Sequence, residues 1–125
     1  MLNQDVCNFY KAHSAYTDYG GIANEGDEGM RIAESLGSGK GVILMNHGLL
    51  TVGHTVDEAA YLFGLMERSC QVQILIEQAG LPKRIVQDEE AAYNFKMAST
   101  PETLFVEFQS YLRLEDKLSG GDFRK

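Results

Sequence analysis

The residue best suited to chemistry in this chain is a histidine between two short apolar runs. His47 follows the run 42–45 and Asn46, while Gly48 and a second run, 49–52, come after it. Each run has the length of a short buried strand, so the backbone must bend near the histidine, and Gly48 tolerates the positive φ that a bend can require. Imidazole is the commonest metal ligand, and a catalytic zinc usually takes three protein ligands plus one open position. The pattern makes His47 a candidate metal ligand at a strand end.

The other interpretation of His47 is a turn histidine whose ring bonds a backbone carbonyl. Spacing alone favours this interpretation, because no second metal ligand lies within a few residues. His54 directly precedes a predicted helix cap, and His13 lies on a partly polar strand. For these two histidines the sequence favours local packing or exposure to solvent over metal binding.

Other patterns that can carry chemistry are weaker here. The acidic residues at 24–28 lack the alternating oxygen ligands of a calcium loop. The glycine-rich segment 37–41 precedes a predicted strand, whereas a phosphate-binding loop precedes a helix. Cys70 lies on the apolar stripe of a predicted helix, where it acts as a small buried side chain. With Cys7 as the other cysteine, two free thiols in a reducing compartment are the simplest interpretation.

Composition argues against two classes of partner. The 125 residues carry a formal net charge of −7 without a Lys/Arg cluster, so neither nucleic acid nor an anionic membrane surface is an expected partner. The first residues lack the basic and apolar regions of a secretory signal, and every apolar run is far shorter than a membrane span. The length predicts one domain. We expect the protein to be cytoplasmic.

Hydrophobic periodicity, together with the Gly, Pro and capping residues at the ends of the predicted elements, predicts an α/β chain. Thr55 and Glu58 form a capping box, in which the Thr55 hydroxyl accepts the Glu58 N–H and the Glu58 carboxylate accepts the Thr55 N–H. Residues 1–118 are expected to form the domain and 119–125 a flexible tail. The predicted elements are strands at 6–16, 42–45 and 49–52, a glycine-rich loop at 20–29, and helices at 26–36, 55–79, 88–97 and 101–118.

Three strands make a small sheet for four helices. The chain also opens directly into a strand-like run, without a preceding cap or turn. Together these features predict an incomplete domain that lacks its N-terminal part, with an open sheet edge and a tendency to associate.

The run 42–53, followed by 55–60 and a long helix, resembles the class II aldolase/adducin family. The resemblance covers roughly residues 1–80 and matches the second half of the family's domain. It implies a three-layer α/β/α sandwich of the class II aldolase type around a mostly antiparallel sheet. The expected fold of residues 1–118 is therefore the C-terminal half of that domain, truncated at its N-terminus.

The resemblance also implies a chemistry. Enzymes of the family, such as L-fuculose-phosphate aldolase and ribulose-phosphate epimerase, hold a divalent metal, usually zinc, with three histidines. Two belong to a His-x-His motif, and the third, in the Asn-His-Gly element, corresponds to His47. The metal stabilises an enediolate formed from a sugar phosphate or another small carbonyl substrate. The complete enzymes are commonly homo-oligomers.

This sequence has no His-x-His motif, which leaves three hypotheses open. The first is a truncated aldolase-like enzyme with one of three metal ligands, impaired activity and weak zinc binding. The second is a non-catalytic interaction module like adducin, whose partners are actin and the cytoskeleton. The third is a self-standing small enzyme that uses His47, His13 and carboxylate side chains.

Overall fold

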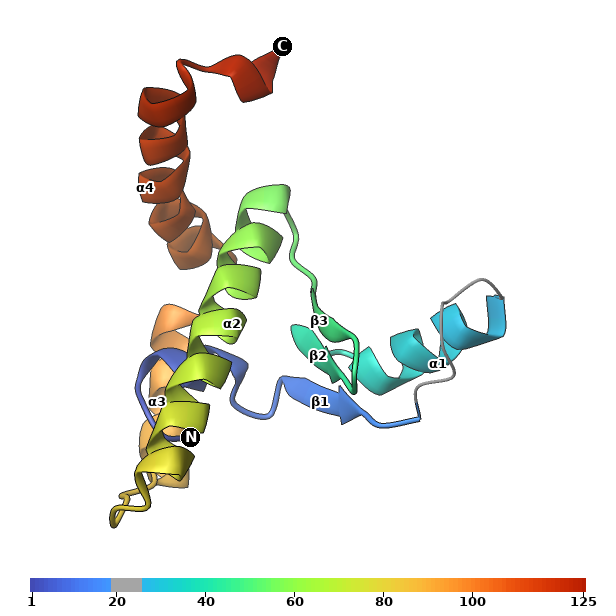
Figure 1. The fold of residues 1–125 in the computed structure, drawn as a ribbon, viewed down its shortest axis with the longest axis vertical. Coiled ribbons are helices and arrows are strands. Elements are labelled where there is room, and N and C mark those ends of the chain that lie inside the picture. Colours follow the sequence, from blue (N-terminus) through green and yellow to red (C-terminus); the bar gives the residue numbers. More distant parts are fainter. Residues whose placement is uncertain (19–25) are drawn as a thin grey trace.

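The structure is a computed structural model that describes residues 1–18 and 26–125. The predicted glycine-rich loop at 20–29 falls mostly outside these residues. A small sheet lies among the helices (Figure 1). In chain order the elements are the 3-10 helix η1 (Asp5–Phe9), β1 (His13–Tyr16), α1 (Gly26–Leu36), β2 (Gly41–Leu44), β3 (Gly48–Thr51), α2 (Val56–Ala79), α3 (Asp88–Ala98), α4 (Pro101–Ser119) and the 3-10 helix η2 (Asp122–Arg124).

The sheet is mixed, with the strand order β1-β2-β3. β1 pairs with β2 in parallel, and β2 pairs with β3 in antiparallel orientation. The expectation of a mostly antiparallel sheet is therefore wrong for the described strands. The physical reason is the connection between β1 and β2, which contains α1, because parallel neighbours need a crossover of this kind.

Helices cover both faces of the sheet. Alternate residues of a strand face opposite sides, and Val42 and Leu44 are buried under α1, where Leu36 packs against them. On the other face, Leu49 of β3 packs against a core cluster that η1, α2 and α4 form together, which consists of Phe9, Leu62, Leu65, Met66 and Leu104. Figure 1 shows α1 and α2 on opposite sides of the strands, which agrees with the predicted three layers.

The predicted strand at 6–16 is wrong in its first half, where the chain forms η1 and enters β1 only at His13. A local hydrogen bond explains the difference, since the Val6 N–H donates to Asn3 Oδ1 at 2.8 Å. An asparagine side chain offers a nearby backbone N–H a hydrogen-bond acceptor, which competes with the carbonyl of a neighbouring strand. The resulting turn buries Phe9 against α2.

The first turn of α2 follows half of the predicted capping box. The Glu58 N–H donates to Thr55 Oγ1 at 3.1 Å, as predicted. The Glu58 carboxylate, however, accepts the N–H of His54 at 2.8 Å and not that of Thr55. The preceding glycine permits this close approach, because a Cβ at Gly53 would lie 2.7 Å from Glu58 Cγ. The helix ends where Gly80 adopts the left-handed conformation.

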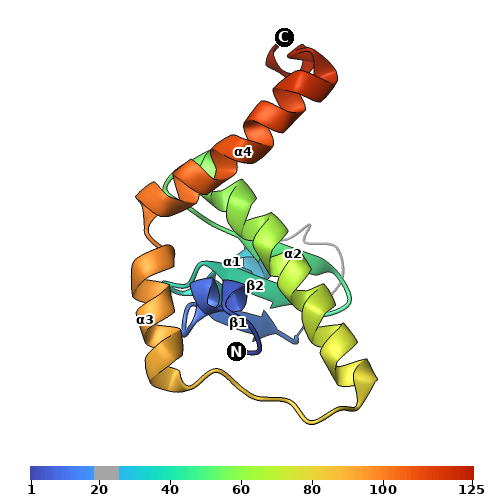
Figure 2. The same cartoon turned by 90° about the vertical axis from the view of Figure 1, so that its left-hand side faces the viewer.

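The two C-terminal helices match their predicted bounds within one residue. Thr100 caps α4 by accepting the Thr103 N–H at 3.2 Å. Figure 2 shows α4 projecting beyond the rest of the protein, with the C-terminus at its far end. Arg124, in the predicted tail 119–125, donates from Nε to Asp116 Oδ1 of α4 at 2.8 Å. The flexibility of this tail stays a prediction.

Candidate functional site

His47 lies in the three-residue turn of the β2–β3 hairpin. Leu44 pairs with Gly48 across the hairpin, and the His47 N–H donates to the Leu44 carbonyl at 3.1 Å. Asn46 has a φ of 57°, in the left-handed region that asparagine tolerates better than most residues. The bend therefore uses the residue before the histidine, whereas the sequence pattern favours Gly48, the residue after it.

The hairpin turn places His47 at the carboxyl end of a parallel strand pair. β1 and β2 end side by side, since Tyr16 pairs with Leu44 and the Met45 N–H donates to the Tyr16 carbonyl at 3.0 Å. In α/β sheets, ligands bind beyond the carboxyl ends of parallel strands. The His47 side chain is exposed at this edge, where a ligand from solvent can reach it.

The other two histidines lie at the opposite end of the sheet. His13 pairs with Gly41 at the start of β2, and His54 follows β3, whose last residue Thr51 also pairs with Gly41. A four-residue strand spans about 10 Å, and His47 lies beyond its far end. The hypothesis that His47 and His13 form one site is therefore wrong.

Across residues 1–18 and 26–125, no group of three His, Cys, Asp or Glu side chains is arranged to hold a metal ion. The described residues therefore do not by themselves fit the zinc site that the resemblance implies. His47 remains the candidate ligand at this edge, and its metal-binding role stays a prediction.

A buried polar cluster supports the edge that carries His47. Tyr16, the last residue of β1, and Glu28, in the first turn of α1, are both buried, and Arg31 forms an ion pair with Glu28. Burial raises the pKa of the Tyr16 hydroxyl, and the nearby Glu28 carboxylate raises it further. The hydrogen bond to Glu28 raises the pKa of Arg31. These contacts fix the start of α1 against the end of β1.

Part of this cluster is predictable from the sequence. Glu28 and Arg31 are three residues apart, which places them on the same face of a helix. Their proximity to Tyr16 depends on the parallel pairing of β1 with β2 through the α1 crossover, which local spacing does not reveal.

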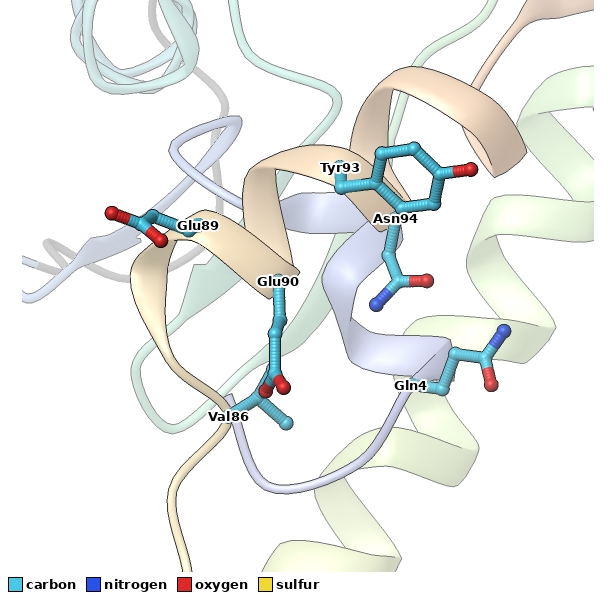
Figure 3. Close-up of a pocket in the computed structure, with 6 residues that line it drawn as sticks. All are labelled: Gln4, Val86, Glu89, Glu90, Tyr93 and Asn94. Carbon is cyan, nitrogen blue, oxygen red and sulfur yellow. The ribbon is translucent and has the colours of Figure 1, made fainter.

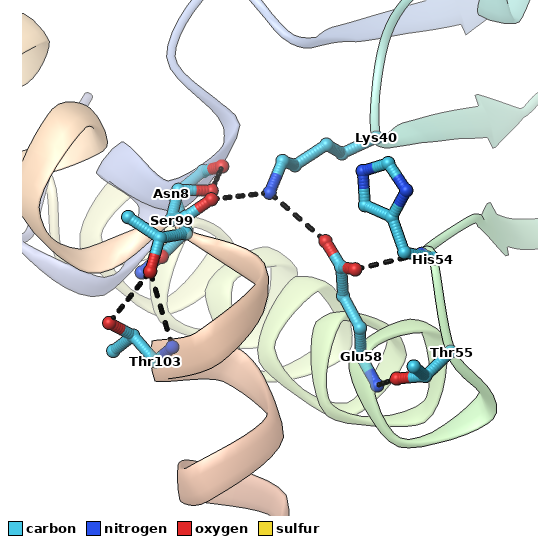
Figure 4. A network of polar contacts seen from close by, with 8 residues as sticks. Asn8, Lys40, His54, Thr55, Glu58, Ser99 and Thr103 are labelled. Atoms are coloured by element: carbon cyan, nitrogen blue, oxygen red, sulfur yellow. Dashed lines mark hydrogen bonds and ion pairs between the residues drawn. The ribbon is translucent and has the colours of Figure 1, made fainter.

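A second polar network lies at the other end of β2 and centres on Lys40 (Figure 4). Lys40 Nζ donates to the Ser99 carbonyl at 2.6 Å and lies 3.3 Å from Glu58 Oε1. Ser99 Oγ in turn donates to the Asn8 carbonyl at 2.9 Å. The network joins β2, α2, η1 and the junction between α3 and α4. It holds the helices against the sheet at the end opposite the His47 turn.

In the part of the chain that the structure describes, no helix is both long and apolar enough to cross a membrane.

Comparison with known proteins identifies the relatives of this fold. The family described as Class II Aldolase and Adducin N-terminal domain matches residues 1–74. Meiotically up-regulated gene 14 protein of Schizosaccharomyces pombe is 53% identical over 79 residues, which make up 63% of this chain and 31% of that protein. Decarboxylase NovR of Streptomyces niveus is 44% identical over 84 residues, or 67% of this chain and 31% of that protein. Alpha-adducin of Rattus norvegicus is 37% identical over 87 residues, or 68% of this chain and 12% of that protein.

Solved structures extend the similarity to nearly the whole chain. L-fuculose 1-phosphate aldolase from Glaciozyma antarctica superposes with a TM-score of 0.85 and 34% identity, covering 99% of this chain and 46% of that enzyme. An aldolase II superfamily protein from Pseudomonas syringae superposes with a TM-score of 0.82 and 28% identity, covering 99% of this chain and 50% of that protein. The chain thus spans about a third of the first two curated relatives and about half of these two structures. The family match and the shared fold together show that the chain belongs to the class II aldolase and adducin family.

Proposed function

We propose that this chain contributes one part of a divalent-metal site of the class II aldolase type, in which His47 supplies one ligand. The observation that carries the proposal is the position of His47. Its exposed imidazole lies in a turn at the carboxyl ends of β1 and β2, where ligands bind in sheets of this kind. Imidazole suits zinc, which is the proposed metal.

The remaining ligands are proposed to come from outside the described residues. The solved Glaciozyma antarctica aldolase has roughly as much chain again beyond the part that this protein covers, which leaves room for them. The proposed substrate of the completed site is a sugar phosphate or a similar small carbonyl compound. The proposed reaction is aldol cleavage or epimerisation through an enediolate in a homo-oligomer, and this chain alone is expected to be inactive or nearly so.

A zinc titration of the isolated chain tests the role of His47. We expect weak binding that becomes at least about tenfold weaker in His47→Ala, because losing even an outer-shell partner of a ligand costs about 10- to 100-fold in metal affinity. Isothermal titration calorimetry with zinc chloride measures both proteins. His54→Ala is the matched control, since it also removes an exposed imidazole and should leave zinc binding unchanged. Tight stoichiometric binding that survives in His47→Ala would contradict the proposal.

A second candidate function is a metal-independent interaction module like adducin, with actin as its partner. The similarity to rat alpha-adducin supports it, as do large apolar side chains that α2 and α4 leave exposed, among them Phe63 and Phe105. Exposed apolar surface of this kind is typical of interaction sites. For this candidate we expect cosedimentation with filamentous actin in the presence of EDTA, reduced in Phe63→Ser and unchanged in His47→Ala. The absence of pelleting at micromolar concentration would exclude it.

A further inference from the structure

The connection between α2 and α3 is an extended, exposed segment. Residues 80–87 join the two helices without forming a helix or a strand. Figure 2 shows this segment running along one end of the molecule. Leu81 is 72% exposed and Ile85 56%. Exposed connections of this kind are preferred sites of cleavage by proteases.

The backbone in the middle of the connection can open at low cost. At its far end the chain is anchored, because the Val86 N–H donates to the Met1 carbonyl at 2.9 Å. Val86 also lines the same hollow as Gln4, close to the N-terminus (Figure 3). Among the residues that the structure describes, none from 81 to 85 forms a backbone-to-backbone hydrogen bond. A protease can therefore bind this segment without breaking the hydrogen bonds of a helix or a strand.

Two basic side chains lie in the middle of this segment. Lys83 forms an ion pair with Glu77, whereas Arg84 is exposed and has no ion pair among the described residues. The other basic residues lie in helices, in tight turns or bends, or at the C-terminus: Lys11, Arg31, Lys40, Arg68, Lys96, Arg113, Lys117, Arg124 and Lys125. The connection is therefore the one extended basic segment inside the described chain, and Arg84 is its more accessible basic residue.

Contacts that do not depend on the connection hold α3 and α4 to the rest of the protein. Ser99 Oγ donates to the Asn8 carbonyl at 2.9 Å, and Lys40 Nζ donates to the Ser99 carbonyl at 2.6 Å. Leu104 of α4 is 1% exposed in the core cluster that it shares with η1 and α2. A break in the connection leaves all of these contacts in place.

We propose that the bond between Arg84 and Ile85 is a cleavage site for an endoprotease that recognises basic side chains, and that the cleaved chain stays together as a complex of residues 1–84 and 85–125. In this reaction water adds across the amide. The C–N bond breaks, so that Arg84 ends in a carboxylate and Ile85 begins with an ammonium group. The first piece keeps His47, and the second carries α3 and α4. The cleavage site is independent of the proposed metal site.

Cleavage has a consequence for stability. In the intact chain α3 and α4 are part of one polypeptide, so their packing does not depend on the protein concentration. After cleavage they are a separate piece, and mass action makes their association depend on concentration. The proposed cut therefore converts a fixed part of the protein into one that dilution can release.

Limited digestion of the whole chain with trypsin, followed by mass spectrometry of the intact pieces, tests the proposal. We expect an early cut after Arg84, at least about 100-fold faster than any cut within α1 to α4, because unfolding equilibria of about 10³ or more protect bonds in folded helices. Size-exclusion chromatography at micromolar concentration should show the two pieces eluting together. The melting temperature of the cut complex should fall on dilution, whereas that of the intact chain should not.

Paired substitutions make the test specific. Lys83→Gln/Arg84→Gln should slow the early cut by at least about 100-fold, since the remaining basic sites are protected by folded structure. Lys96→Gln/Arg113→Gln removes two basic side chains from α3 and α4 and should leave the early cut unchanged. An early cut inside a helix, an unchanged rate in Lys83→Gln/Arg84→Gln, or pieces that separate at micromolar concentration would overturn the proposal.

Discussion

Replacing Lys40 by alanine is expected to lower the free energy of unfolding by about 3–5 kcal/mol, the typical effect of breaking a buried ion pair. The Glu58 side chain is 2% exposed and that of Lys40 18%, so the substitution leaves a buried carboxylate without its cation. It also removes the donor to the Ser99 carbonyl. Urea denaturation followed by circular dichroism measures the change. Because whole domains are stable by only about 5–15 kcal/mol, this loss is a large fraction of the total.

A surface ion pair provides the matched control for Lys40. Lys83 pairs with Glu77, but their side chains are 40% and 52% exposed. Lys83→Ala should therefore lower the free energy of unfolding by no more than about 1 kcal/mol. The double variant Lys40→Met/Glu58→Leu should recover part of the loss, because it removes both buried charges. Recovery should be incomplete, since Glu58 also accepts the His54 N–H. Equal effects of Lys40→Ala and Lys83→Ala would contradict the role of the buried network.

The sequence predicts best those features whose cause lies within a few residues. The helix that begins after Thr55 and the helix that begins at Pro101 have short-range capping patterns, and their caps form in the structure. Helix ends are equally local, as the left-handed Gly80 shows. The first half of the predicted strand at 6–16 fails because apolar content alone does not distinguish a short helical turn from a strand when asparagine side chains bond the local backbone.

Features that depend on distant segments are not predictable in this way. The parallel pairing of β1 with β2 depends on the direction in which the connection through α1 crosses the sheet, and no local sequence pattern indicates that direction. Lys40 contacts Glu58, 18 residues away, and Ser99, 59 residues away. For the site, the sequence correctly places His47 in a turn between two strands, because apolar runs and a glycine mark that turn. The buried Asn8 Oδ1, which has no hydrogen-bond partner among the described residues, is visible only in three dimensions.

The second large effect is expected in a chimeric aldolase. The chain superposes on the Glaciozyma antarctica L-fuculose 1-phosphate aldolase over 99% of its length with 34% identity, so it can replace the matching part of that enzyme in one polypeptide. If His47 is a metal ligand, the chimera should bind one zinc ion per chain and cleave L-fuculose 1-phosphate. His47→Ala in the chimera should weaken zinc binding by at least about 100-fold, since a direct ligand matters at least as much as an outer-shell partner. Cobalt substitution gives a readout besides activity, because visible absorption bands report the coordination of the metal.

The comparison of chimeras separates the role of His47 from errors of folding. The tip of a hairpin tolerates substitution of an exposed side chain. In metal-free buffer the free energy of unfolding of the His47→Ala chimera should therefore lie within about 1 kcal/mol of that of the parent chimera, although the variant loses zinc binding. His54 is an exposed histidine at the opposite end of the sheet. The His54→Ala chimera should therefore keep both zinc and activity. A chimera that folds and binds zinc equally with and without His47 would show that this histidine is a turn residue and that the metal site lies elsewhere. Loss of zinc in His47→Ala alone, with the cobalt absorption bands altered and the fold intact, would establish the hairpin turn as part of the metal site.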